Sequence, residues 1–189
     1  MKLVLQPTDV AQWHALVSEA QHASSRQLDE GLESYLVFLL MRFCGQPEMA
    51  RRIMALEFLQ AQNSNGLKTE RLRDVGDQCL LFSGLFPKIA EKRLVSVSYF
   101  VGLGRTAYHQ LSECVDQHSD QFYGRLAQAF VSVMDVLHAM RGLSGEPVMD
   151  PLAAAELWSD TGSPSAFKIL TGEGNFLPIS EELKNKRTH

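Results

Sequence analysis

Apolar residues recur every three or four positions along most of the chain, the spacing that places them on one face of an α-helix. In residues 97–115 the heptad-like positions are Val97, Val101, Gly104, Tyr108, Leu111 and Val115. Two of them, Gly104 and Tyr108, are small or polar-tipped and not simply apolar. Residues 67–86 repeat the spacing and become apolar on nearly every side in their second half. Both segments therefore predict long helices, and the second is expected to be surrounded by others.

The same spacing predicts four further long helices, separated by turn residues. They cover residues 9–22, about 28–43, 47–62 and 119–141. Ser24 or Ser25 is expected to cap the second of these helices, because a serine hydroxyl accepts hydrogen bonds from the first free N–H groups of a helix. Gly45 and Pro47 precede the third helix, and "NSNG" at 63–66 predicts the turn that ends it.

No segment alternates apolar and polar residues for long enough to predict a strand, so the expected fold class is all-α. Two short helices are predicted near residues 151–159 and 164–170. A chain of 189 residues suits one domain. We therefore expect a helical domain at residues 1–171, with about six main helices and short C-terminal ones, followed by a loop and polar tail at 172–189.

Charge and apolar run length exclude two classes of partner. The formal charge of -4 comes from well mixed acids and bases, which offer no basic surface to a nucleic acid or an anionic membrane. The longest apolar run, "YLVFLLMRFC" at 35–44, is interrupted by Arg42 and has half the length of a membrane span. The start, "MKLVLQPTDVAQW", lacks the apolar stretch of a signal peptide. The prediction is a cytoplasmic protein that binds neither nucleic acid nor a membrane.

The three cysteines, Cys44, Cys79 and Cys114, form no C-x-x-C pair and have no histidine at ligand spacing. This pattern argues against a disulfide framework and against a structural zinc site. Each cysteine has an apolar neighbour, so we interpret all three as small buried hydrophobic residues. A reactive thiol is the alternative.

Four phrases of the chain resemble those of a group of uncharacterised bacterial proteins of similar length. They are "LESYLVFLLMRF", "RLRDVGDQCLLFSGLFP", "VSVSYFVGLGRTAYHQL" and "ELWSDTGSPSA", and together they touch about a third of the sequence. The resemblance implies a bacterial, cytoplasmic, helical protein. It transfers no functional residues.

One polar group stands out within the predicted core. Asp77 lies in the helix expected to be buried, and a buried carboxylate without a partner is very costly. Arg73, one turn earlier, is the local candidate for its cation, and Arg105 on the helix at 97–115 is the interhelical one. We expect Asp77 and Arg105 to be mostly buried and to form a salt bridge. Such a pair is in the first place a structural device that fixes how two helices meet.

The alternative interpretation is a ligand pocket beside the stripe of small residues that contains Gly102, on the helix at 97–115. Its candidate residues are Asp77, Tyr99, Gly102, Arg105, Tyr108 and His109. Small residues let another helix or a ligand approach the backbone, and Gly102 is expected to lie in such a tight contact. Arg105 would hold an anionic group, and His109 would act as acid, base or hydrogen-bond donor. The sequence shows no recognisable set of a nucleophile, a base and an orienting acid.

Two acid-x-x-His pairs, Glu19–His22 and Asp135–His138, have the spacing of ligands in di-iron helical bundles. A complete site also needs carboxylates from two further helices, where Glu33 and Glu57 are the candidates and neither lies on an evidently inward face. We therefore expect no metal and no cofactor, and keep a dimetal or heme-oxygenase-like enzyme as a lesser alternative.

The apolar residues exceed what the inner faces of one small bundle need, and such an excess often marks an association surface. The favoured hypothesis is a non-enzymatic helical interaction or regulatory protein that acts through a protein-binding surface, as a homo-oligomer or with a protein partner. The alternative is a small-molecule-binding helical enzyme. It predicts a pocket between the helices at 67–86 and 97–115, with Arg105 and His109 in its wall.

Overall fold

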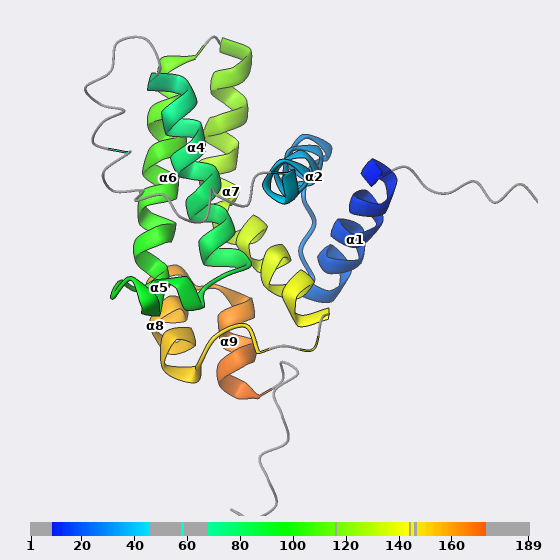
Figure 1. Ribbon diagram of the computed structural model, residues 1–189, viewed down its shortest axis with the longest axis vertical. Helices are drawn as coiled ribbons and strands as arrows, with labels where there is room; N and C mark the ends of the chain where they lie inside the picture. Colours follow the sequence, from blue (N-terminus) through cyan, green and yellow to red (C-terminus); the bar gives the residue numbers. More distant parts are fainter. Residues whose placement is uncertain are drawn as a thin grey trace, which may run out of the picture.

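The computed structural model describes residues 9–45, 58, 68–115, 117–143, 145 and 147–172. Within these residues the chain forms eight helices and no strand, which confirms the all-α fold (Figure 1). The helices are α1 (Asp9–Ser24), α2 (Glu30–Gly45), α4 (Lys68–Gly84), α5 (Lys88–Lys92), α6 (Val97–Cys114), α7 (Gln117–Leu143), α8 (Pro151–Thr161) and α9 (Pro164–Thr171). The helix expected at 47–62 lies outside the described residues except for Phe58, which is helical and packs against the core.

Three long helices, α4, α6 and α7, lie side by side and form the centre of the structure (Figure 1). Helices α1 and α2 pack against each other and against α7 on one side of this group. The shorter helices α5, α8 and α9 gather at one end of the bundle, where α8 contacts α6 and α9 contacts α7. None of the described helices is long and apolar enough to cross a membrane.

The apolar spacing explains which helix faces are buried. Every residue of α4 from Val75 to Gly84 is buried, as the apolar second half of this segment predicts. Helix α6 buries the heptad-like positions Val97, Val101, Gly104, Tyr108 and Leu111. The helices expected from the sequence at these two places are therefore confirmed, together with the faces that they bury.

Helix α2 begins later than the serines suggest. Asp29 accepts a hydrogen bond from the backbone N–H of Leu32 at 2.9 Å and is the cap of this helix. The prediction that Ser24 or Ser25 caps α2 is wrong, because α1 continues to Ser24 and Ser25 turns the chain in the left-handed region with φ 54°. The aspartate competes better here because its carboxylate also suits the positive end of the helix dipole.

Close helix packing uses three glycines, and Gly102 is not one of them. A Cβ atom at Gly76, Gly84 or Gly104 would lie 2.5–2.6 Å from a side-chain atom of a neighbouring helix, whereas nothing lies within 4 Å at Gly102. Gly102 is exposed. The expectation of a tight contact at Gly102 is therefore wrong, and the glycine that closes α6 onto its neighbours is Gly104.

The cysteines differ in their surroundings. Cys79 is fully buried in the core, and burial raises the pKa of its thiol far above the ordinary value. This agrees with its interpretation as a small hydrophobic residue. Cys44 and Cys114 are exposed, so the same interpretation is wrong for these two. Each lies near the C-terminal end of its helix, α2 or α6, where a turn of apolar neighbours does not guarantee burial.

Candidate functional site

Asp77 lies at the centre of a polar cluster within the apolar core. Its Oδ1 atom accepts hydrogen bonds from the hydroxyls of Tyr35 at 2.5 Å and Tyr108 at 2.6 Å. Its Oδ2 atom is bound by the guanidinium of Arg42, which also approaches Asp74 at 3.7 Å. We call Asp77, Tyr35, Arg42 and Tyr108 the Asp77 cluster. It joins helices α2, α4 and α6.

A glycine makes this cluster possible. The ring of Tyr108 lies directly over Gly76, where any Cβ atom would come within 2.5 Å of the ring. Because Gly76 has no side chain, the fully buried ring can pack closely against α4 and bring its hydroxyl to the neighbouring Asp77. The sequence "GDQ" at 76–78 thus provides both the space for the tyrosine and the acceptor for its proton.

Burial dominates the electrostatics of the cluster. It raises the pKa of Asp77, although the charge of Arg42 and the hydrogen bonds from Tyr108 and Tyr35 favour the carboxylate. Burial, followed by the charge of Asp77, raises the pKa of both Tyr35 and Tyr108 well above their usual range. Both phenols therefore remain protonated and act as hydrogen-bond donors rather than as bases.

The predicted salt bridge between Asp77 and Arg105 is wrong, because a different arginine binds Asp77. Asp77 is buried as predicted, but its partner is Arg42 of α2, and Arg105 is exposed on α6. The physical reason is the register of α6. Tyr108 occupies the inward position that faces Asp77, which leaves Arg105 on the outer surface. A single arginine inside the apolar run at 35–44 was the signal that could have identified Arg42.

Three of the residues chosen from the sequence do meet, on another face of the molecule. Gly102, Arg105 and His109 line an open cavity of about 710 Å³ between α6 and α7, together with Gly124 of α7. Neither glycine has anything within 4 Å of its missing Cβ atom. The pocket was expected between α4 and α6, but those helices pack too closely through Gly76 and Gly104. Tyr99 lies apart, half exposed near the start of α6 with its ring against Phe100.

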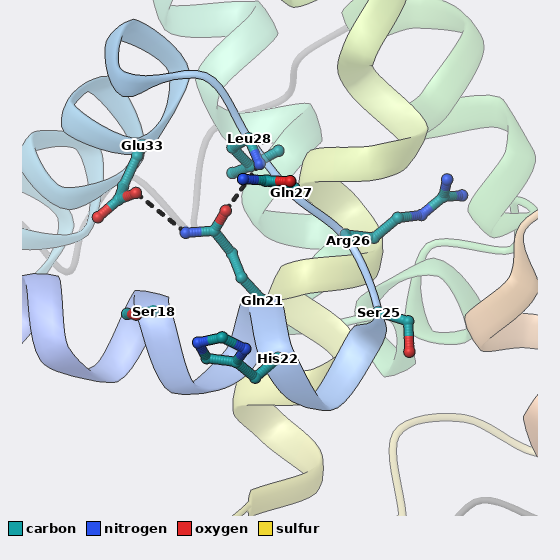
Figure 2. A pocket seen from close by; sticks show the side chains of 8 residues that line it. All are labelled: Ser18, Gln21, His22, Ser25, Arg26, Gln27, Leu28 and Glu33. Carbon is teal, nitrogen blue, oxygen red and sulfur yellow. Dashed lines mark hydrogen bonds between the residues drawn. The ribbon is translucent and has the colours of Figure 1, made fainter.

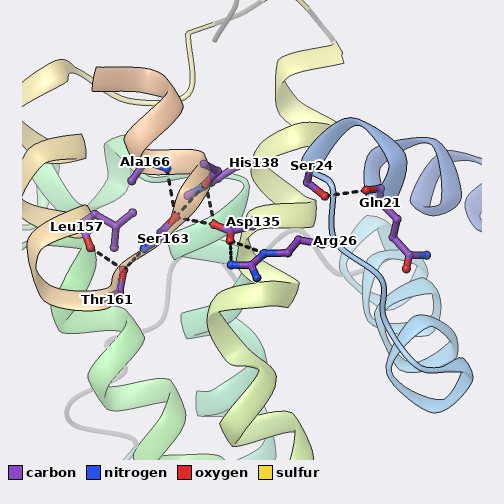
Figure 3. A network of polar contacts seen from close by, with 10 residues as sticks. Gln21, Ser24, Arg26, Asp135, His138, Leu157, Thr161, Ser163 and Ala166 are labelled. Carbon is purple, nitrogen blue, oxygen red and sulfur yellow. Dashed lines mark hydrogen bonds and ion pairs between the residues drawn. The ribbon is translucent and has the colours of Figure 1, made fainter. Parts of the chain in front are cut away.

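The structure contains a second buried polar cluster that the sequence did not predict. The sequence pattern identified only two of its members, Asp135 and His138, as a spaced pair. Asp135 of α7 accepts hydrogen bonds on Oδ1 from Ser163 at 2.5 Å and Ser165 at 2.7 Å. Its Oδ2 atom accepts from Nε and Nη2 of Arg26 at 3.0 and 2.7 Å. Figure 3 shows Arg26 reaching this carboxylate from the segment between α1 and α2, opposite to the serine. We call Asp135, Arg26, His138, Ser163 and Ser165 the Asp135 network.

His138 completes the network and is neutral in the folded protein. Its Nε2 atom lies 2.8 Å from the backbone carbonyl of Ser83, an acceptor, so Nε2 carries the proton. Its Nδ1 atom lies 2.6 Å from the hydroxyl of Ser165, whose single proton is shared between this nitrogen and the carboxylate of Asp135. The carboxylate contacts the serines rather than the imidazole, so this is not the Ser–His–Asp order of a hydrolase. The network holds the start of α9 against α7.

Acid should weaken this attachment. Burial lowers the pKa of His138, with the Ser83 carbonyl and the charge of Asp135 acting in the opposite direction. Below the usual histidine pKa of about 6.5, residue 138 therefore binds a proton more readily in the unfolded chain than in the folded protein. We expect the free energy of unfolding to fall as the pH drops below this value, by at most about 1.4 kcal/mol per pH unit from this residue. Urea unfolding between pH 7.5 and 5 measures it.

The matched variants for this measurement are His138→Gln and His22→Gln, because His22 is exposed on α1. The first lowers stability but should flatten the dependence of stability on pH, and the second should leave the slope unchanged. An equal slope in wild type and His138→Gln would contradict the assignment of the buried neutral histidine.

A polar hollow of about 470 Å³ lies beside the segment between α1 and α2 (Figure 2). Gln21 crosses it, donating to Glu33 at 3.1 Å and accepting from the backbone N–H of Leu28 at 2.7 Å. Arg26 also lines the hollow, its side chain extends away from Gln21 (Figure 2), and its guanidinium binds Asp135. Gln21 thus finds its hydrogen-bond partners within the chain. We interpret these contacts as the connection that holds α1 against α2, and not as a ligand site.

The two acid-x-x-His pairs have different environments. Glu19 and His22 are exposed on α1, whereas Asp135 and His138 are buried on α7 and bind serines. In the part of the chain that the structure describes, no three histidine, cysteine, aspartate or glutamate side chains come together as metal ligands. Glu57 lies outside this part. The absence of a bound metal or cofactor therefore stays a prediction.

Comparison of the chain with protein-family models, with curated proteins and with solved structures finds no match. The resemblance of its four phrases to bacterial proteins stays a prediction as well. Function must therefore be argued from the surface and the cavities of this structure.

Proposed function

We propose that the protein is a helical interaction protein that binds another polypeptide through the outer surface of α8 and α9. The observation that carries this proposal is an exposed aromatic pair. Trp158 of α8 and Phe167 of α9 are 44% and 43% exposed, and their ring centroids lie 5.2 Å apart. Large aromatic side chains are enriched among the residues that contribute most to protein binding, and two in contact form a natural anchor.

The pair is held on a well fixed support. Helix α8 ends at Gly162 in the left-handed conformation with φ 66°, and Ser163 directly afterwards caps α9. Ser163 and Ser165 are in turn bound to Asp135. The angle between α8 and α9 is therefore fixed before any partner arrives. A preorganised surface loses less conformational entropy when it binds.

The aromatic pair, and not charge, indicates the chemistry of the partner. Glu156 and Asp160 lie two residues before and after Trp158, a spacing that directs them away from its ring, and Lys168 of α9 directly follows Phe167. An exposed aromatic pair is complemented by apolar side chains. The partner that fits is a polypeptide segment with apolar side chains at its centre.

The double variant Trp158→Ala/Phe167→Ala tests this function. If the pair is the anchor, binding to the captured partner should weaken by about 30-fold or more, because truncating a central tryptophan costs at least about 2 kcal/mol. Affinity capture followed by titration with the purified partner measures the loss. The control is Leu143→Ala, which removes a side chain of similar exposure, 44%, from the end of α7. Equal binding by the double variant and the control would contradict the proposal.

Self-association is the form of binding that the sequence analysis favours, and sedimentation velocity of the purified chain tests it directly. A dimer that the double variant converts to a monomer would identify a second copy as the partner. A dimer that persists would place self-association on another surface.

A second candidate function is small-molecule binding between α6 and α7. It is favoured by the convergence of Gly102, Arg105 and His109 on one cavity, which agrees with their selection from sequence. The buried Oε1 atom of Gln110, in the same cavity wall, has no hydrogen-bond partner. A fragment screen by NMR with Arg105→Met as the comparison tests this candidate, because fragments bound there should lose contact with the variant.

A further inference from the structure

A small cavity opens beside the Asp77 cluster and is distinct from the surface of α8 and α9. Its volume is about 190 Å³, and its walls come from α2, α4 and α7. This is below the range of about 300–1,000 Å³ typical of drug-sized ligands, so it suits a molecule of few non-hydrogen atoms.

The cavity has two arginines with donors to spare. Arg42 and Arg73 both line it, and the Nε atom of each is buried without a hydrogen-bond partner. Arg42 already binds Asp77 and approaches Asp74 through its Nη atoms, so the free Nε–H is an additional donor. Buried donors without an acceptor are unfavourable by about 1–3 kcal/mol each. The missing groups are acceptors.

The acidic groups near the cavity do not supply these acceptors. Both carboxylate oxygens of Asp77 are occupied by Tyr35, Tyr108 and Arg42. Asp74 lies 3.7 Å from Nη1 of Arg42, on the guanidinium edge and not at Nε. The wall of the cavity itself contains two guanidinium groups and one carboxylate, that of Asp77, so it can accept a further negative charge, and a planar carboxylate matches the guanidinium geometry.

The remaining walls are aromatic and aliphatic. Tyr35, Tyr123, Phe38 and Leu39 complete the lining, and Phe38 is 59% exposed. These side chains give the cavity an apolar surface that an organic group can contact. An inorganic anion would leave these walls uncovered, whereas an organic anion with an apolar body would contact them.

We propose that this cavity binds a small organic carboxylate, with its oxygens on the guanidinium groups of Arg42 and Arg73 and its apolar body against Tyr35, Phe38 and Tyr123. Recognition combines charge-assisted hydrogen bonds at one end with aromatic contact at the other. This site would make the interaction protein responsive to a metabolite-sized anion, and its existence does not depend on the function of α8 and α9.

Isothermal titration of the purified full-length chain with benzoate, benzyl alcohol and inorganic phosphate tests the proposal. Benzoate should bind, benzyl alcohol should bind at least tenfold more weakly because it lacks the charge, and phosphate should bind at least tenfold more weakly because it lacks the apolar body. The same order should appear in the rise of the thermal unfolding midpoint with ligand concentration.

Arg73→Met is the informative variant, since loss of Arg42 would leave the buried Asp77 without its cation. It should weaken benzoate binding at least tenfold, while Arg71→Met, on the same helix but not in the cavity wall, should leave it unchanged. Circular dichroism establishes that both variants are folded. Failure of benzoate to bind at millimolar concentration, equal binding by Arg73→Met, or a preference for phosphate would each overturn the proposal.

Discussion

Arg42→Met should lower the free energy of unfolding by about 3 kcal/mol, because it removes the cation from a carboxylate that is 1% exposed. Methionine keeps most of the length and volume of the arginine stem, so the loss reports mainly on the charge. Asp77 retains the hydrogen bonds from Tyr35 and Tyr108, which holds the effect at the lower end of the range for broken buried pairs. Chemical denaturation at pH 7 measures the change.

The matched control is Arg105→Met, which removes the same charge from an exposed position on α6. It should change stability by less than about 0.5 kcal/mol. In the double variant Arg42→Met/Asp77→Asn, the carboxylate charge is removed as well, so part of the stability should return and the two effects should not add. Additive losses, or a larger loss for Arg105→Met, would show that Arg42 is not the cation of Asp77.

Gly104→Ala should lower the free energy of unfolding by about 2 kcal/mol or more. The new methyl group would lie 2.6 Å from Cε2 of Phe130 and 2.7 Å from Cβ of Cys79. The ring of Phe130 is fully buried, and the Cβ atom of Cys79 is fixed to the backbone of α4, so neither can move aside without shifting a helix. Overpacking of this kind costs typically about 1–3 kcal/mol and outweighs the better helix propensity of alanine.

Gly102→Ala, two residues away on the same helix, provides the control. Its methyl group would meet nothing within 4 Å. Only the propensity gain remains, so stability should rise by about 0.5–1 kcal/mol. Thermal and urea unfolding of both variants would measure a difference of opposite sign between neighbouring glycines. A loss at Gly102 would mean that another segment of the chain covers this position.

The sequence predicts the helices well because the helical period is recorded at many positions at once. Helices α4 and α6 follow from many apolar residues, and a single misjudged residue changes little. Caps are harder, since Ser24, Ser25 and Asp29 all have suitable oxygens and the choice among them depends on where α1 ends. The burial of Cys79 follows from a central helix, whereas Cys44 and Cys114 needed knowledge of the helix ends.

The polar sites could be predicted only in part, because partners come from helices whose relative rotation the sequence does not record. The apolar neighbours of Asp77 in the sequence indicated a buried carboxylate. The choice between Arg42 and Arg105 as its cation required the register of α2 against α4. Asp135 and His138 were recognised as a spaced pair. Their true partners, Ser163 and Ser165, lie 27–30 residues further along the chain and have no distinctive pattern.

The contact between Gly76 and Tyr108 restricts how this protein can change over evolutionary time. A side chain at position 76 is tolerated only after the ring at 108 has become smaller, and that second change removes one of the hydrogen bonds to Asp77. The two positions are therefore expected to vary together in related sequences, and the carboxylate to vary with them. Either substitution arriving first would pass through a destabilised intermediate, so the trio of Gly76, Asp77 and Tyr108 should be inherited as a unit.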